Sequence, residues 1–162
     1  MKKIILLGLL VPFLSFAQIN NKIEGLTIDT SCELEYTRNL GNQNNYSCVF
    51  QGDNEKVLQY SVTVQNLFED MNGLSEATLS VFKEEFLKGL VSNAEASNQD
   101  VKSIYLSNGQ RAILMTSYLT YSGHKFINTS IGFLYKQKSF IVNLTTNNLE
   151  KKTNLIKRIK IK

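Results

Sequence analysis

The chain has 162 residues and a formal net charge of +4 at pH 7. Six of its basic residues and no acidic residue lie in residues 151–162, so the positive charge belongs to a tail and argues against a basic nucleic-acid-binding face. One His and two Cys exclude the ligand spacing of zinc fingers and zincins and the CxxC spacing of redox proteins.

Residues 1–17 have the pattern of a secretory signal peptide. Two lysines precede an apolar run from Ile4 to Phe13, and the small residues Ser15 and Ala17 stand where signal peptidase requires them. The run is shorter than the roughly 20 apolar residues that span a bilayer, so we expect cleavage after Ala17. The sequence therefore predicts an exported protein, periplasmic or secreted, with no transmembrane segment and one mature domain, residues 18–162.

Both cysteines fall in a predicted β-hairpin. A turn centred on Leu40 places Cys32 opposite Cys48, and Leu34 opposite Tyr46, on one face of two antiparallel strands. Disulfides persist in oxidising compartments, and closing a loop of this size stabilises a protein by about 3 kcal/mol. We predict a Cys32–Cys48 disulfide with a structural role.

A strand and a long helix are predicted next. Residues 57–68 alternate apolar and polar side chains, the pattern of a strand with one buried face. Ser75 is a good N-cap for a helix over 73–93, in which Glu84 and Lys88 are spaced to form an ion pair. The apolar residues that recur at helical spacing are expected to face the core: Leu79, Phe82, Phe86 and Leu90.

An antiparallel meander follows. Asn108-Gly109 is a strong two-residue hairpin turn, and a second turn around 136–139 pairs Phe133 with Val142 and Ile131 with Leu144, so that the apolar sides coincide.

The end of the chain is predicted to be helical. Asn147 and Glu150 resemble the capping box of a final helix, and Leu155, Ile156 and Ile159 would face inward. Alternatively, 159–161 ends as a short strand.

This order predicts an α+β fold, with an antiparallel sheet of about six to seven strands, a long central helix and a C-terminal helix packed on it. Three segments mark this element order: "GLTIDTSCELEY", "VLQYSVTVQNL" and "NLEKKTNLIKRIKI". In the order of its elements across roughly residues 24–162, the chain resembles the Mog1/PsbP-like superfamily. The resemblance implies a sandwich of that type and a binding or assembly-accessory role, and it offers no catalytic residue. Cystatin-like and NTF2-like folds are alternatives, although both place a long helix earlier.

No group of residues predicts a catalytic, cofactor or metal site. His124 stands beside a turn glycine and is expected on the surface. The hydroxyl residues lack a GxSxG or SxxK pattern that would supply a base. Glu33 and Glu35 lie on a predicted wet strand face, whereas acid catalysis requires a buried carboxyl. The sequence therefore favours a protein that is not an enzyme.

We expect an exported binding or envelope-accessory protein whose partner is a protein or an envelope component, with its oligomeric state left open. A protruding ordered loop, at 38–45 or 93–100, would instead favour a periplasmic inhibitor or immunity-type protein. A cavity of several hundred cubic ångströms lined by Phe82, Phe86 and Tyr118 would favour a small-molecule or lipid carrier. An exposed apolar patch would favour partner binding.

Overall fold

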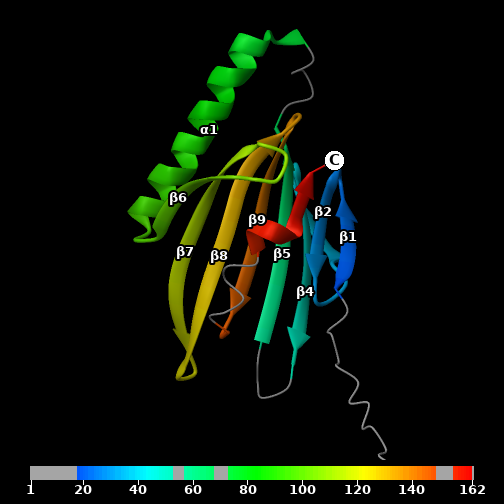
Figure 1. Cartoon of the computed structure of the whole chain (residues 1–162), viewed down its shortest axis with the longest axis vertical. Coiled ribbons are helices and arrows are strands. Elements are labelled where there is room, and N and C mark those ends of the chain that lie inside the picture. Colours follow the sequence, from blue (N-terminus) through cyan, green and yellow to red (C-terminus); the bar gives the residue numbers. More distant parts are fainter. Residues whose placement is uncertain (1–17, 53–56, 68–72, 149–154, 162) are drawn as a thin grey trace, which may run out of the picture.

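The computed structural model describes residues 18–52, 57–67, 73–148 and 155–161. The predicted signal peptide and Glu150 of the predicted capping box lie outside these residues. Figure 1 shows two antiparallel sheets and a long helix. The α+β class and the antiparallel sheet predicted from the sequence are confirmed.

Seven strands form the larger sheet, in the spatial order β3 (Glu35–Leu40), β4 (Gln43–Gln51), β5 (Val57–Asn66), β9 (Lys138–Thr146), β8 (His124–Tyr135), β7 (Arg111–Tyr121) and β6 (Asp100–Tyr105). The smaller sheet has the order β1 (Ile19–Ile23), β2 (Leu26–Thr30) and β10 (Ile159–Ile161). The helices are α1 (Glu76–Ala96) and α2 (Leu155–Arg158).

The main core lies between one face of the larger sheet and the smaller sheet with α2. Alternate residues of β5, from Leu58 to Val64, are buried there as predicted. Ile28 of β2, Leu155 of α2 and Ile159 of β10 belong to the same cluster. A polar contact reaches into this core, where Arg158 donates a hydrogen bond of 3.0 Å to the hydroxyl of the fully buried Tyr60.

Helix α1 packs on the other face of the larger sheet, mainly over β6, β7 and β8. Ser75 caps the helix as predicted, because its Oγ accepts a hydrogen bond from the amide of Thr78 at 3.2 Å. The buried residues of α1 are Leu87 and Ala94. The four residues predicted to face the core are only half-buried: Leu79, Phe82, Phe86 and Leu90. The contact with the sheet is thus made mainly by the C-terminal half of the helix, as Figure 1 shows.

The register predicted for the first hairpin is wrong. Leu40 pairs with Gln43 across the turn Gly41-Asn42, which is three residues from the predicted register, and a bulge between Tyr36 and Arg38 reduces the shift to two, so Tyr36, and not Leu34, lies opposite Tyr46. Gly41 has φ 65°, a left-handed conformation that a tight turn requires and that glycine adopts without strain. Past the bulge, a shift of two leaves the side chains on their predicted face, so the apolar pattern there could not reveal the error.

The predicted disulfide is present although Cys32 is not a strand partner of Cys48. Cys32 lies in the segment before β3, and the two Cα atoms are 6.0 Å apart. The buried side chain of Asn21 holds that segment in place. Its Oδ1 accepts a hydrogen bond of 2.7 Å from the amide of Leu34, and its Nδ2 donates one of 2.7 Å to Thr30 Oγ1.

The predicted pairing of β8 with β9 is also wrong by two residues. Tyr135 pairs with Lys138 across a two-residue turn, so Phe133 lies opposite Phe140, and Ile131 lies opposite Val142. The two phenylalanine rings stack with their centroids 5.3 Å apart. The hairpin at Asn108-Gly109 is confirmed, because β6 and β7 pair on either side of it.

The end of the chain forms a short strand at 159–161, which was the alternative that the sequence left open. Residues 155–158 form α2, and Ile159–Ile161 continue as β10, which pairs with β2. Leu155 and Ile159 are fully buried and Ile156 is half-buried. The sequence did not predict the smaller sheet, which joins the beginning and the end of the described chain.

Candidate functional site

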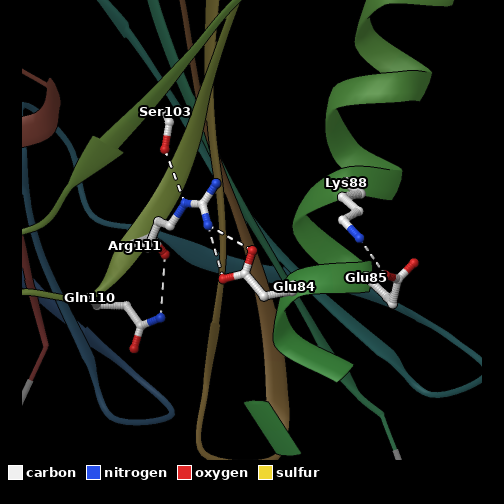
Figure 2. Close-up of polar contacts among 6 residues, drawn as sticks. All are labelled: Glu84, Glu85, Lys88, Ser103, Gln110 and Arg111. Carbon is white, nitrogen blue, oxygen red and sulfur yellow. Dashed lines mark hydrogen bonds and ion pairs between the residues drawn. The ribbon is translucent and has the colours of Figure 1, made fainter. Parts of the chain in front are cut away.

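A groove with a volume of about 300 Å³ separates α1 from the start of β7. Figure 2 shows Arg111 of β7 reaching Glu84 of α1, with two hydrogen bonds of 2.7 and 2.9 Å. Arg111 Nε also donates to Ser103 Oγ at 3.1 Å. The predicted Glu84–Lys88 pair is wrong, because Glu84 bonds Arg111 and Lys88 bonds Glu85 at 2.7 Å. These charges are paired with each other and clamp the helix to the sheet, so we assign the groove a structural role.

The three aromatic residues predicted to line a carrier pocket lie on opposite faces of the larger sheet. Ile113 and Met115 of β7 contact α1, and side chains alternate along a strand, so Tyr118 points to the other face. Tyr118 lines a surface hollow of about 530 Å³ with residues of β7, β8 and Asn147, and Phe82 and Phe86 of α1 take no part in it. The described hollow therefore does not bring these three side chains together.

A second polar cluster joins the two sheets at Glu24, in the turn between β1 and β2. The carboxylate of Glu24 accepts hydrogen bonds from Lys138 Nζ at 2.6 Å, Asn44 Nδ2 at 2.8 Å and the Tyr46 hydroxyl at 3.2 Å. Burial raises the pKa of Glu24, but the hydrogen bonds from Lys138 and Asn44 and the charge of Lys138 together lower it more. The pKa of this carboxyl therefore lies below its usual value, and the charged form fastens the smaller sheet to the larger one.

Replacing Glu24 with Gln is expected to lower the free energy of unfolding by about 1 kcal/mol at pH 7, because Lys138 loses its charged partner. Gln keeps the length of the side chain and the left-handed backbone of this position, where φ is 49°. A carboxyl with a lowered folded pKa stabilises the protein above its unfolded pKa, and this contribution is lost as the pH falls through the folded value.

The difference between wild type and E24Q should therefore be constant above about pH 5 and shrink below about pH 4. Urea denaturation at a series of pH values measures it. Glu33→Gln, at an exposed position, is the matched control. Equal losses from both substitutions, or a difference that persists in acid, would contradict the assignment.

The end of the β7–β8 hairpin extends past its neighbours. β6 pairs with β7 only as far as Thr116, and β9 pairs with β8 only from Ile127 onward. Residues 117–126, which we call the arm, therefore project beyond the rest of the sheet (Figure 1). The arm carries large apolar side chains that are exposed: Tyr118 at 63%, Leu119 at 48% and Tyr121 at 75%. Because side chains alternate along a strand, Leu119 and Tyr121 lie on one face of the arm and Tyr118 lies on the other, so each face carries an exposed apolar side chain.

The other residues considered in the sequence lie on the surface. His124 closes the turn at the tip of the arm and is exposed, as are Glu33 and Glu35. Residues 38–45 form the end of the β3–β4 hairpin, and 93–100 end α1 and begin β6. Within the described ranges, no three His, Cys, Asp or Glu side chains gather closely enough to hold a metal ion. No helix in that part of the chain is long and apolar enough to cross a membrane.

Sequence comparisons found no matching family model and no similar curated protein. Three chains of solved structures match. One is the crystal structure of a protein of unknown function from Pseudomonas aeruginosa, which is similar over 85% of this chain and 88% of that one, with a TM-score of 0.47 and 10% sequence identity. These comparisons assign no function to this chain.

Proposed function

We propose that this protein is an exported, non-enzymatic binding protein that holds a partner protein with its β7–β8 arm. The observation that carries the proposal is the exposure of Tyr118, Leu119 and Tyr121 on a projecting hairpin. Tyrosine is enriched among the residues that dominate binding energy at protein interfaces. Exposed large apolar side chains are typical of interaction surfaces, and a partner that received both faces of the arm would cover all three.

The arm has the rigidity that a binding element needs. Its two strands pair in register from Ser117 with Asn128 to Tyr121 with His124. The turn residues Ser122 and Gly123 both have positive φ, of 48° and 79°, as the tight two-residue turns of hairpins require. The strands continue without a break into the middle of the larger sheet, so the exposed side chains are held before a partner arrives, which reduces the entropy lost on binding.

Two features support export. The leader at residues 1–17 has the composition of a signal peptide, and the Cys32–Cys48 disulfide is compatible with an oxidising compartment. An inhibitor or immunity-type protein is the second candidate. A projecting ordered hairpin that enters the active site of a target would serve that role, and the arm fits this description better than 38–45 or 93–100.

Replacing Tyr118 and Tyr121 together with Ser is expected to weaken partner binding at least about thirtyfold, since each buried interface tyrosine contributes about 1–2 kcal/mol. The partner is sought by capture from the envelope fraction of the native organism with the mature chain, and its affinity is then measured with the purified protein.

The matched control replaces Tyr36 and Tyr105 with Ser, because these tyrosines are exposed to a similar extent, at 56% and 70%, on other strands. Capture that is lost in the arm variant and kept in the control supports the proposal. A captured protein that binds both variants equally, or neither, would overturn it. An enzyme whose activity falls on binding would identify the inhibitor role.

A further inference from the structure

The outer edge of the arm is open. β6 pairs with β7 only as far as Thr116, so past this residue no described strand lies beside β7 on that side (Figure 1). In antiparallel strands, directly opposed residues alternate between pairs that exchange both backbone hydrogen bonds and pairs that exchange none. A two-residue turn is closed by a bonded pair, here Tyr121 with His124. Thr120 is therefore in the other class, and its N–H and C=O point to the open side.

The edge of the arm lacks the features that keep an exposed strand from pairing with another chain. Such edges are usually protected by charged side chains or by bulges. The two edge strands of the larger sheet have this protection. β3 carries Glu35, Arg38 and a bulge between residues 36 and 38, and β6 carries Asp100 and Lys102. The edge of the arm, residues 117–121 with the sequence SYLTY, carries no charge.

We propose that the partner held by the arm is the arm of a second copy of this chain. This inference rests on the proposed function, because it takes the arm as the binding element. Antiparallel pairing of two identical edges about a two-fold axis perpendicular to the sheet places one residue opposite itself. Thr120 is that residue, because its backbone groups point outward. The two threonines then exchange both backbone hydrogen bonds, and the two hairpins form one four-stranded sheet.

The position of β6 favours this register over its neighbours. With Thr120 opposite itself, Ser122 of the second copy lies opposite Tyr118, two residues short of Thr116, where β6 begins. A register centred on Leu119 or Tyr118 would bring the turn of the second copy onto β6. The arm therefore projects far enough to admit a second arm in the register centred on Thr120.

In this register the side chains of the two copies match on both faces of the new sheet. Leu119 of each copy lies opposite Tyr121 of the other, so four apolar side chains meet on one face. These residues are 48% and 75% exposed in the single chain, and pairing removes apolar surface from water. On the other face the two Thr120 side chains lie opposite each other, a favourable cross-strand pair. A segment that complements itself in this way favours a second copy over an unrelated strand.

The contact is small, so the dimer should be weak. About five residues of each copy take part, compared with the roughly 20–30 residues a side of a standard stable interface. We therefore expect monomer and dimer to exchange, with a dimer fraction that rises with concentration. Sedimentation velocity of the folded mature protein, up to millimolar concentration, measures the dissociation constant.

Charged substitutions at Thr120 test both the partner and the register. Like charges directly opposite each other are destabilising, so T120K and T120E should each weaken self-association at least about tenfold. An equimolar mixture of the two variants should restore it, because opposite charges then face each other. This recovery requires residue 120 to lie opposite itself, and it also shows that both variants are folded. The matched controls are T37K and T37E, at an exposed threonine of the edge strand β3, which should associate as the wild type does.

Wild-type protein that stays monomeric up to millimolar concentration would overturn the inference. Self-association that T120K and T120E leave unchanged, or that their mixture does not restore, would overturn it too. Failure of the proposed function gives a different result. If the arm captures a different protein, and the Tyr118 and Tyr121 substitutions abolish that capture while the wild-type chain stays monomeric, the proposed function stands and the second copy is excluded. Recovery in the mixture, with capture of this chain alone, supports both.

Discussion

Replacing Cys32 and Cys48 together with Ala is expected to lower the free energy of unfolding by about 3 kcal/mol, a large fraction of the stability of a domain of this size. The two residues are 16 positions apart, and a crosslink over such a distance restricts mainly the unfolded chain. The bond also fixes the segment before β3 to the strand β4, whose side chains Tyr46 and Phe50 pack beside it on the main core. Urea denaturation of the mature protein measures the loss.

Reduction supplies the control for this prediction. A reductant should lower the stability of the wild-type protein to nearly that of C32A/C48A and leave the double variant unchanged. In exported protein collected without reductant, a thiol reagent should label neither cysteine and should label both after reduction and unfolding. Two reactive thiols in correctly exported protein would contradict the structural role of the bond.

Replacing Gly132 with Val is expected to destabilise the protein by about 2 kcal/mol through overpacking. Gly132 lies in β8 beneath α1, and a Cβ atom there would lie 2.5 Å from Leu90 Cδ1 and 3.1 Å from Ile141 Cδ1. No real Cβ tolerates the shorter of these distances, so Leu90 or the helix itself must move away. Glycine at this position leaves the space that the side chain of Leu90 fills.

A double-mutant cycle with Leu90→Ala tests whether the contact is the cause. Leu90→Ala removes the atoms that would clash, so the two substitutions together should cost clearly less than the sum of their separate costs. Chemical denaturation of the four proteins gives the coupling. Strictly additive costs would show that the effect of G132V arises elsewhere, for example in β8 alone.

The sequence predicted the elements better than their pairing, for a physical reason. Strand β5 is encoded by the alternation of apolar and polar side chains along it. The helix cap is encoded by the single hydroxyl of Ser75, which binds an amide three residues later. The registers of two hairpins were predicted wrongly, because a shift of two residues along a strand keeps each side chain on the same face of the sheet. Only the turns distinguish the two registers, and Gly41 and Lys136 adopt positive φ at two-residue turns.

Features that depend on residues distant in the sequence escaped prediction. Ile28 pairs with Ile159 in the smaller sheet, and neither segment alone indicates the other. Glu84 has an ordinary helical neighbour in Lys88, yet it bonds Arg111, which tertiary packing brings close. The exposed arm exists because β7 and β8 extend past β6 and β9. This property belongs to the assembled sheet.

The position of β10 has a consequence for when the protein folds. β2 pairs with β1 on one side and with β10, more than a hundred residues later, on the other. Leu155 and Ile159 fill the centre of the main core, so a growing polypeptide cannot complete that core until the ribosome has added these residues. Contacts of such long sequence separation form slowly. The main core therefore closes late, only after the more than one hundred residues between β2 and β10 have been added.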